Sequence, residues 1–193
     1  MSVGIYFTSD EHDGHRNIIK YCNRPFANII EMREEMIRRH NSVVGVHDIV
    51  YHLGDMFWKF RKPHEVYDYL KQLNGKHNYI LGNHEEALRD FLNTSPNAPF
   101  FECLYERMYL RADFTNTPAG IILDRYAGRV WQNSSHGSYQ LYGHSHAGLP
   151  DVEGLLQMDV GVDSHDFYPV SLDQVRDTML RKNYKDPCVK GVV

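Results

Sequence analysis

The sequence has 193 residues, of which 42% are hydrophobic and 24% charged, and its formal net charge is −4 at pH 7. These values are typical of a folded globular protein, and the length favours a single domain over residues 1–193. The negative charge argues against a broad basic surface for nucleic acid, and the sequence predicts neither a secretory signal nor a membrane-spanning segment.

The first half of the sequence alternates strand-like and helix-like segments. Short apolar runs predict buried strands over 3–9, 48–53 and 77–81, and each run ends on glycine or a polar residue. Apolar residues at helical spacing predict helices over 28–40 and 63–73, and 85–92 is expected to be helical too. This alternation predicts βαβ units with parallel strands.

The second half is expected to be richer in strands. Segments 100–113, 120–123, 138–142 and 156–160 have strand-like composition, and a polar connection with two prolines precedes them at 93–99. Ser171 is a suitable N-cap for a closing helix that extends to residue 181. The fold class predicted from the pattern is therefore α/β.

Four short motifs follow predicted strands or turns and carry metal-ligating side chains. They are Asp10-x-His12, Gly54-Asp55, residues 82–85 (Gly-Asn-His-Glu) and residues 143–146 (Gly-His-Ser-His). Ligands in open α/β sheets gather at the carboxyl ends of strands, so distant motifs can meet there. Carboxylate, amide and imidazole ligands suit Mn, Fe, Co, Ni or Zn. Each motif alone is common by chance, whereas the four together predict a metal site.

In this order the motifs resemble those of the calcineurin-like metallophosphoesterase superfamily: D-x-H, G-D, G-N-H, a lone histidine and G-H-x-H. The resemblance spans roughly residues 5–165, and segments 7–12, 14–26 and 142–146 are similar to a small single-domain branch from bacteria and phages. It implies a four-layer αββα sandwich with two mixed sheets.

The resemblance also implies roles for individual residues. One ion would be held by Asp10, His12, Asp55 and His146, and a second by Asp55, Asn83, the lone histidine and His144. His84 would contact the phosphate and protonate the leaving group as the catalytic residue, while a metal-bound hydroxide attacks phosphorus. We expect one or two divalent ions per chain, with manganese first and Fe, Zn, Ni or Co as alternatives.

The sequence departs from this pattern where the lone histidine is expected, because the segment reads Leu123-Asp124-Arg125-Tyr126. A guanidinium has no lone pair for a metal. Three alternatives follow: the second ion is weak or absent, Asp124 or His136 replaces the ligand, or Arg125 binds the substrate phosphate. The first is preferred. Because two ions would repel the guanidinium, we expect Arg125 to swing out or metal occupancy to fall.

Further residues are assigned with less specific signals. The predicted substrate-binding residues are Asn83, His84, Arg125, His136 and His15. An aromatic and basic cluster could stack on a nucleotide or simply be an exposed loop, namely Trp58, Lys59, Arg61 and Lys62. A supporting role near the site is expected for Asp159, Asp163 and His165. The remaining histidines are expected on the surface or paired in the core, namely His40, His47, His52, His64 and His77.

The predicted function is metal-dependent hydrolysis of a phosphate ester, by preference a small or nucleotide-like phosphodiester. The alternative is a metal-poor, weakly active or inactive homologue that binds phosphate or nucleotide. A nuclease would need a concave basic face, so nucleic acid is a disfavoured partner, and no membrane partner is expected. Three widely spaced cysteines without a C-x-x-C pair favour a reducing, cytoplasmic location. The sequence predicts no oligomeric state.

Overall fold

Two mixed β-sheets form the centre of the computed structural model, which describes residues 3–58, 61–84, 86–94 and 101–189. The first sheet has the strand order β4-β3-β2-β1-β9. Its strands are β1 (Ile5–Thr8), β2 (Ile49–His52), β3 (Lys76–Ile80), β4 (Phe101–Tyr105) and β9 (Val170–Ser171). Strands β1 to β4 are parallel, and β9 runs antiparallel to β1.

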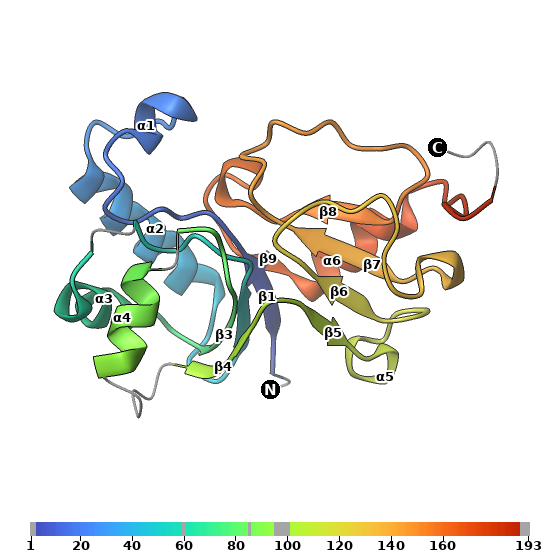
Figure 1. The fold of residues 1–193 in the computed structure, drawn as a ribbon, viewed down its shortest axis with the longest axis horizontal. Helices are drawn as coiled ribbons and strands as arrows, with labels where there is room; N and C mark the ends of the chain where they lie inside the picture. Colours follow the sequence, from blue (N-terminus) through green and yellow to red (C-terminus); the bar gives the residue numbers. More distant parts are fainter. Residues whose placement is uncertain (1–2, 59–60, 85, 95–100, 190–193) are drawn as a thin grey trace.

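The second sheet has the order β5-β6-β7-β8. Its strands are β5 (Met108–Leu110), β6 (Ile121–Leu123), β7 (Tyr139–Tyr142) and β8 (Gln157–Asp159). Strands β6, β7 and β8 are parallel, whereas β5 is antiparallel to β6. The carboxyl ends of β6 and β7 therefore lie at the same edge of this sheet, next to the first sheet (Figure 1).

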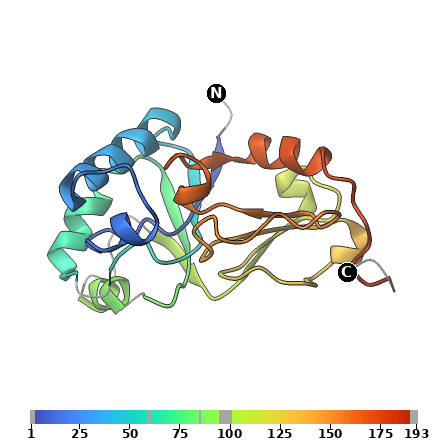
Figure 2. The same ribbon diagram turned by 90° about the horizontal axis from the view of Figure 1, so that it is seen from above.

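Helices lie on the outer sides of the two sheets, as the view from above shows (Figure 2). The helices are α1 (Ile18–Tyr21), α2 (Ile29–Val43), α3 (Pro63–Leu70), α4 (Glu86–Thr94), α5 (Ala112–Thr115) and α6 (Leu172–Leu180), with 3-10 turns η1 (Ser134–His136) and η2 (Val162–Ser164). Asn28 begins α2 by accepting hydrogen bonds from the backbone of Ile30 and Glu31, and Ser171 begins α6 through a capping box. Polar caps thus fix where these two helices start.

The largest hydrophobic cluster joins the two sheets. Phe7, Leu53 and Ile80 of the first sheet region pack with Ile121 and Leu141 of the second, all at most 1% exposed. A separate cluster forms where α3 and α4 cover the first sheet, with Tyr79, Val66, Leu70, Leu88 and Phe91. Each such side chain contributes about 1.5–3 kcal/mol on burial, so the two clusters hold the sheets and helices in place.

The predicted fold class is confirmed, since the chain forms two mixed sheets with helices as expected for the αββα sandwich. The predicted strand over 100–113 is in fact two strands in different sheets, β4 and β5, followed by the short helix α5. Strand β9 and helix α1 have no counterpart among the predictions. Among the described helices, none combines the length and the apolar character needed to cross a lipid bilayer.

Candidate metal centre

The two sheets meet at the carboxyl ends of their strands, and the predicted ligands lie there. Asp10 follows β1, Asp55 follows β2 and Asn83 follows β3, while His144 and His146 follow β7. A parallel bridge joins Ser9 to Gly161, and the Val162 amide donates to the Ser9 carbonyl at 2.9 Å. The site is therefore built across the junction between the sheets, from both halves of the chain.

Asp10 is held rigidly at this junction and is fully buried. Its Oδ2 accepts hydrogen bonds from the Ser9 hydroxyl and the His144 amide, both at 2.7 Å. Burial raises the pKa of Asp10, and the positive charge of Arg125 opposes that shift. Oδ1 is left facing His12 and Arg125, so one carboxylate oxygen points into the site.

Asp55 is oriented in the same way, through a hydrogen bond from the His84 amide to its Oδ1 at 2.8 Å. Its other oxygen, Oδ2, faces His12 and Arg125. A side chain at Gly82 would lie 2.2 Å from Asp55 Oδ1, and one at Gly143 would lie 2.6 Å from Asp10 Oδ2. These glycines are required because the backbone passes against the ligating carboxylates.

His12 is buried, and neither nitrogen of its ring has a hydrogen-bond partner among the described residues. Its Nε2 lies 3.8 Å from both Asp10 Oδ1 and Asp55 Oδ2. Burial, followed by the charges of His146, Arg24 and Arg125, lowers the pKa of His12 to about 2. The imidazole is thus neutral, which is the form that ligates metal ions.

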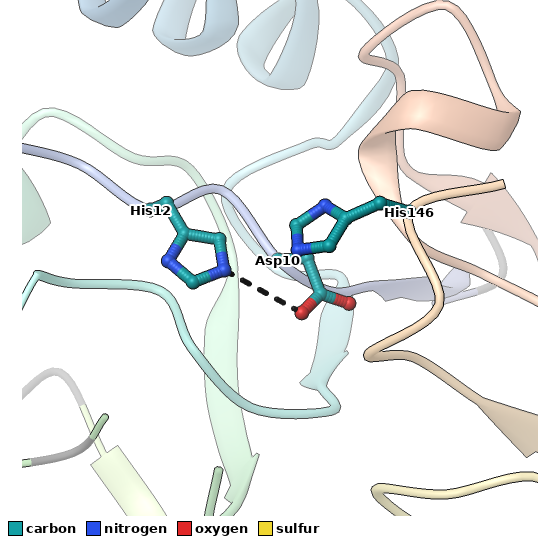
Figure 3. A group of neighbouring side chains, drawn as sticks. All are labelled: Asp10, His12 and His146. Carbon is teal, nitrogen blue, oxygen red and sulfur yellow. Dashed lines mark ion pairs between the residues drawn. The ribbon is translucent and has the colours of Figure 1, made fainter. Parts of the chain in front are cut away.

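His146 completes this group from the second half of the chain, and Figure 3 shows its imidazole beside Asp10 and His12. One ligand atom from each of these three residues lies within 4.8 Å of the others. His146 Nδ1 is 2.7 Å from Asp163 Oδ2, which leaves Nε2 as the nitrogen for a ligand. A carboxylate that accepts a hydrogen bond from the other ring nitrogen commonly orients a metal-ligating histidine in this way.

Arg24 contacts both Asp163 and the backbone of Asp10, and it was not predicted from the sequence. It donates to both oxygens of Asp163, at 2.7 and 2.8 Å, and to the backbone carbonyls of Asp10 and Glu11. Asp163, which was expected only to support the site, therefore links Arg24 to His146. Cys22 lies close enough to Asp163 and His146 to form another candidate ligand group, but Asp163 already accepts from Arg24 and His146 Nδ1.

The donor set fits one divalent ion. Ligands at about 2.0–2.2 Å from an ion lie about 3–3.5 Å from one another, and the 3.8 Å separations around His12 are close to that value. Buried imidazole nitrogens without partners are costly unless something binds them. Asp10, His12, Asp55 and His146 thus offer oxygen and nitrogen donors of the type that Mn, Fe and Zn accept.

Five of the eleven described residues other than glycine with positive φ angles are candidate ligands. Positive φ angles occur at Asp10 (64°), His12 (55°), Asp55 (53°), His144 (69°) and His146 (46°). Left-handed backbone is uncommon for residues other than glycine and costs of order 1–3 kcal/mol each. At these five candidate ligands, the surrounding packing therefore holds the backbone in a conformation that the residues themselves disfavour.

Arg125 does not swing out of the site as the sequence suggested. The Arg125 side chain is 3% exposed and points inward. Its Nη1 lies 2.7 Å from Asp10 Oδ1, and its Nη2 pairs with Asp55 Oδ2. The expectation considered only repulsion by two ions and not the two buried carboxylates, with which the guanidinium pairs. Asp124 points instead to Arg107, at 2.7 Å, and is not brought to the predicted ligands.

His84, Asn83 and His15 surround the group on its outer side. The His84 ring lies 6.0 Å from the His12 ring and 5.1 Å from the Trp58 ring. His15 stacks on Trp58 at 3.8 Å, and the exposed Asn83 accepts from Arg125 Nη2 at 3.4 Å. These three predicted substrate-binding residues are therefore near the metal ligands.

His136 is not brought to them. It lies exposed in η1, before β7, whereas β7 reaches the site with its opposite end.

Arg61 is paired with Asp13 at 3.1 Å and with Glu65 at 2.6 Å, so it is not a spare cation for substrate. Lys59 of the aromatic and basic cluster and Glu85 of the third motif lie outside the described residues.

Three of the remaining histidines form a buried network behind the site. His52 Nδ1 is 3.2 Å from Glu11 Oε1, and His52 Nε2 is 3.0 Å from His77 Nδ1. His40 contacts the Asn74 carbonyl at 2.9 Å. The expected core or surface positions therefore hold: these three histidines are buried and paired, and His47 and His64 are exposed.

Comparison with known proteins gives three findings. The family model described as calcineurin-like phosphoesterase matches residues 4–163. An uncharacterised protein of Methanocaldococcus jannaschii is 32% identical over 176 residues, which cover 89% of this chain and 88% of that protein. A crystal structure of a protein of unknown function from Aquifex aeolicus superposes with a TM-score of 0.68 at 21% identity, covering 92% of this chain and 100% of that chain, so the fold is shared.

Proposed function

The chain belongs to the calcineurin-like phosphoesterase family, and on that premise we propose that it hydrolyses phosphate esters with a divalent metal ion held by Asp10, His12, Asp55 and His146. The family match makes phosphoester hydrolysis the expected chemistry. The assignment of these four residues rests on their geometry, and manganese is the preferred ion, with Fe, Zn, Ni or Co as alternatives.

One observation carries the proposal, namely the buried imidazole of His12, whose ring nitrogens have no hydrogen-bond partner among the described residues. Both of its nitrogens lack hydrogen-bond partners in the described part of the chain, and Nε2 faces two carboxylates at 3.8 Å. A packed core would avoid such a group, because an unsatisfied buried nitrogen costs about 1–3 kcal/mol. A ligand role for Nε2 explains why the fold keeps it.

The roles of the other residues follow from their places around this group. A bound divalent ion would neutralise charge on the phosphate oxygens and lower the pKa of a water. His84 would donate a proton to the leaving group, and Asn83 and His15 would contact the phosphate or its substituent. Trp58, stacked on His15 and close to His84, offers an aromatic side chain beside the proposed site, which supports a nucleotide-like diester as the preferred substrate class.

The alternative proposal is a metal-poor phosphate- or nucleotide-binding protein. It is supported by the ion pairs of Arg125 with Asp10 and Asp55, which satisfy both carboxylates without a metal. In that case phosphate would bind without turnover. The two proposals differ in metal content and in hydrolysis, so one set of measurements separates them.

The test is metal content per chain after purification without chelator, together with hydrolysis of bis-p-nitrophenyl phosphate and p-nitrophenyl phosphate with added Mn²⁺. We expect metal-dependent turnover in the wild type and loss of both metal and turnover in His12→Gln. The exposed His47→Gln is the matched control and should retain both. Metal-free, inactive wild-type protein that binds phosphate would support the alternative instead.

A further inference from the structure

A single nitrogen of Arg125 touches the three residues that the family pattern would give to a second ion. Nη2 pairs with Asp55 Oδ2, lies 3.4 Å from Asn83 Oδ1 and lies 3.3 Å from His144 Nδ1. Arg125 itself stands where the family has its lone histidine ligand. The guanidinium nitrogen thus fills the space between the remaining second-site ligands.

The fold is shaped around this side chain. Nη1 donates to the Ser9 hydroxyl at 3.2 Å and to the Leu53 carbonyl at 3.1 Å, in addition to its ion pair with Asp10. A side chain on Gly54 would come within 2.9 Å of Arg125 Cδ, and Gly54 has φ of +98°. Space for the arginine stem and acceptors for its two terminal nitrogens, Nη1 and Nη2, are therefore both present in the packed interior.

We propose that Arg125 is the second cation of this centre, so that the chain binds one metal ion, on Asp10, His12, Asp55 and His146, and uses the guanidinium as its other positive charge. This inference rests on the proposed function, which supplies the first ion. It assigns Asn83 and His144 to the guanidinium instead of to a metal.

Three physical reasons favour one ion over two. An ion in the second position would need the Asp55 and Asn83 oxygens and the His144 nitrogen at about 2.0–2.2 Å, a volume that Nη2 now fills. Moving the guanidinium aside would leave a buried charge without its two carboxylates. Two ions beside the guanidinium would raise the net charge of the centre from one positive charge to three, and like charges a few ångströms apart repel strongly away from water.

The test is a titration of metal-free protein with Mn²⁺, followed by electron paramagnetic resonance and by metal content after gel filtration. The wild type is expected to bind one ion per chain with the hyperfine pattern of an isolated Mn²⁺. Arg125→His restores a ligand and is expected to bind two ions per chain with the spectrum of an exchange-coupled pair. The control is Arg107→His, whose native side chain is 67% exposed, and it should behave as the wild type.

Several results would overturn the inference. A wild-type protein that binds two coupled ions and hydrolyses diesters would refute the role of Arg125 and leave the proposed function standing. Wild-type protein that binds no ion and has no turnover would refute both. The wild-type measurement decides between these results even if Arg125→His fails to fold, which circular dichroism would reveal. A folded Arg125→His with one ion would also contradict it.

Discussion

At the scale of single residues, the position of His84 makes its proposed role testable through the leaving group. Its backbone amide holds Asp55, while its ring lies beside those of His12 and Trp58. His84→Ala keeps the amide and removes only the ring. We expect about a 10²–10⁴-fold loss of kcat on a cyclic nucleotide, whose ribose leaving group needs a proton, and a much smaller loss on bis-p-nitrophenyl phosphate.

Steady-state kinetics on the two substrates measure this difference. Metal content should be unchanged in His84→Ala, and the exposed His64→Ala should match the wild type on both substrates. An equal loss on both substrates would show that the ring positions the phosphate and does not protonate the leaving group.

Asp163 makes a second prediction at this scale, because it orients His146 and is itself held by Arg24. Desolvation raises the pKa of Asp163, but hydrogen bonds from His146 and Arg24 outweigh that effect and the net shift is downward. Asp163→Asn removes the charge that fixes the imidazole. Removing such a partner typically weakens metal binding by about 10–100-fold, and calorimetric titration with Mn²⁺ should show a loss of this size.

The matched control is Asp166→Asn, whose native side chain is 76% exposed and pairs with Arg39. It should bind Mn²⁺ as the wild type does. Unchanged affinity in Asp163→Asn would mean that packing alone orients His146.

Sequence reasoning could find residues whose signal is local. The D-x-H and G-H-x-H motifs marked His12 and His146, which the structure brings together with Asp10. Arg24 was missed because its partner Asp163 is 139 residues away, and no local pattern connects the two. His136 was predicted to bind substrate for the opposite reason: it is near His144 in sequence, but β7 lies between them.

At the scale of elements, segments with a clear apolar pattern were predictable and segments without one were not. The strands that became β1, β2 and β3 and the helices that became α2, α3 and α6 each carry a clear apolar pattern. Strand β9 has two residues and helix α1 has four, which is too few for periodicity. The chain crosses from the first sheet to the second between β4 and β5, and strand-like composition continues through that crossing.

The packing of α2 against β2 and β3 leads to a prediction about pH. His40, His52 and His77 lie together there, with ring centroids between 5.2 and 6.4 Å apart. Burial lowers the pKa of His40 to about 4 and holds that of His77 well below its ordinary value. The unfolded chain therefore takes up protons at a higher pH than the folded chain, so stability falls as the pH drops from about 6.5 towards 4.

His40→Gln removes one of these titrating groups and retains a donor for the Asn74 carbonyl. We expect the variant to lose about 2 kcal/mol less stability than the wild type between about pH 7 and pH 5. Urea unfolding in the presence of a chelator measures this difference free of metal effects. The exposed His47→Gln is the control, and an identical pH slope in His40→Gln and the wild type would contradict the prediction.

At the scale of the whole molecule, the charge of the centre bears on which ester it accepts. Asp10 and Asp55 carry two negative charges, Arg125 one positive charge, and a divalent ion would add two more. The resulting net charge of +1 matches the single negative charge of a phosphodiester. A centre with two ions and no guanidinium would have a net charge of +2, which matches the more highly charged monoester. A single ion beside Arg125 thus favours diesters on electrostatic grounds.

We therefore expect kcat/KM of the wild type to be higher for bis-p-nitrophenyl phosphate than for p-nitrophenyl phosphate. In Arg125→His loaded with Mn²⁺, the ratio should shift towards the monoester by at least about tenfold, because one further unit of charge acts in a desolvated site. The surface substitution Arg107→His should leave the ratio unchanged. A shift towards the diester in Arg125→His would contradict this charge argument.

The junction between the two sheets also sets when the centre can come into existence during protein synthesis. Asp10, His12 and Asp55 belong to the part of the chain that leaves the ribosome first, whereas His146 and its partner Asp163 are made much later. A nascent chain that ends before β7 has three of the proposed ligands but lacks the second imidazole and the Ser9–Gly161 bridge that closes the junction. With the proposed ligands, a complete donor set exists only after His146 has been synthesised, so we expect metal binding to follow the closing of this junction.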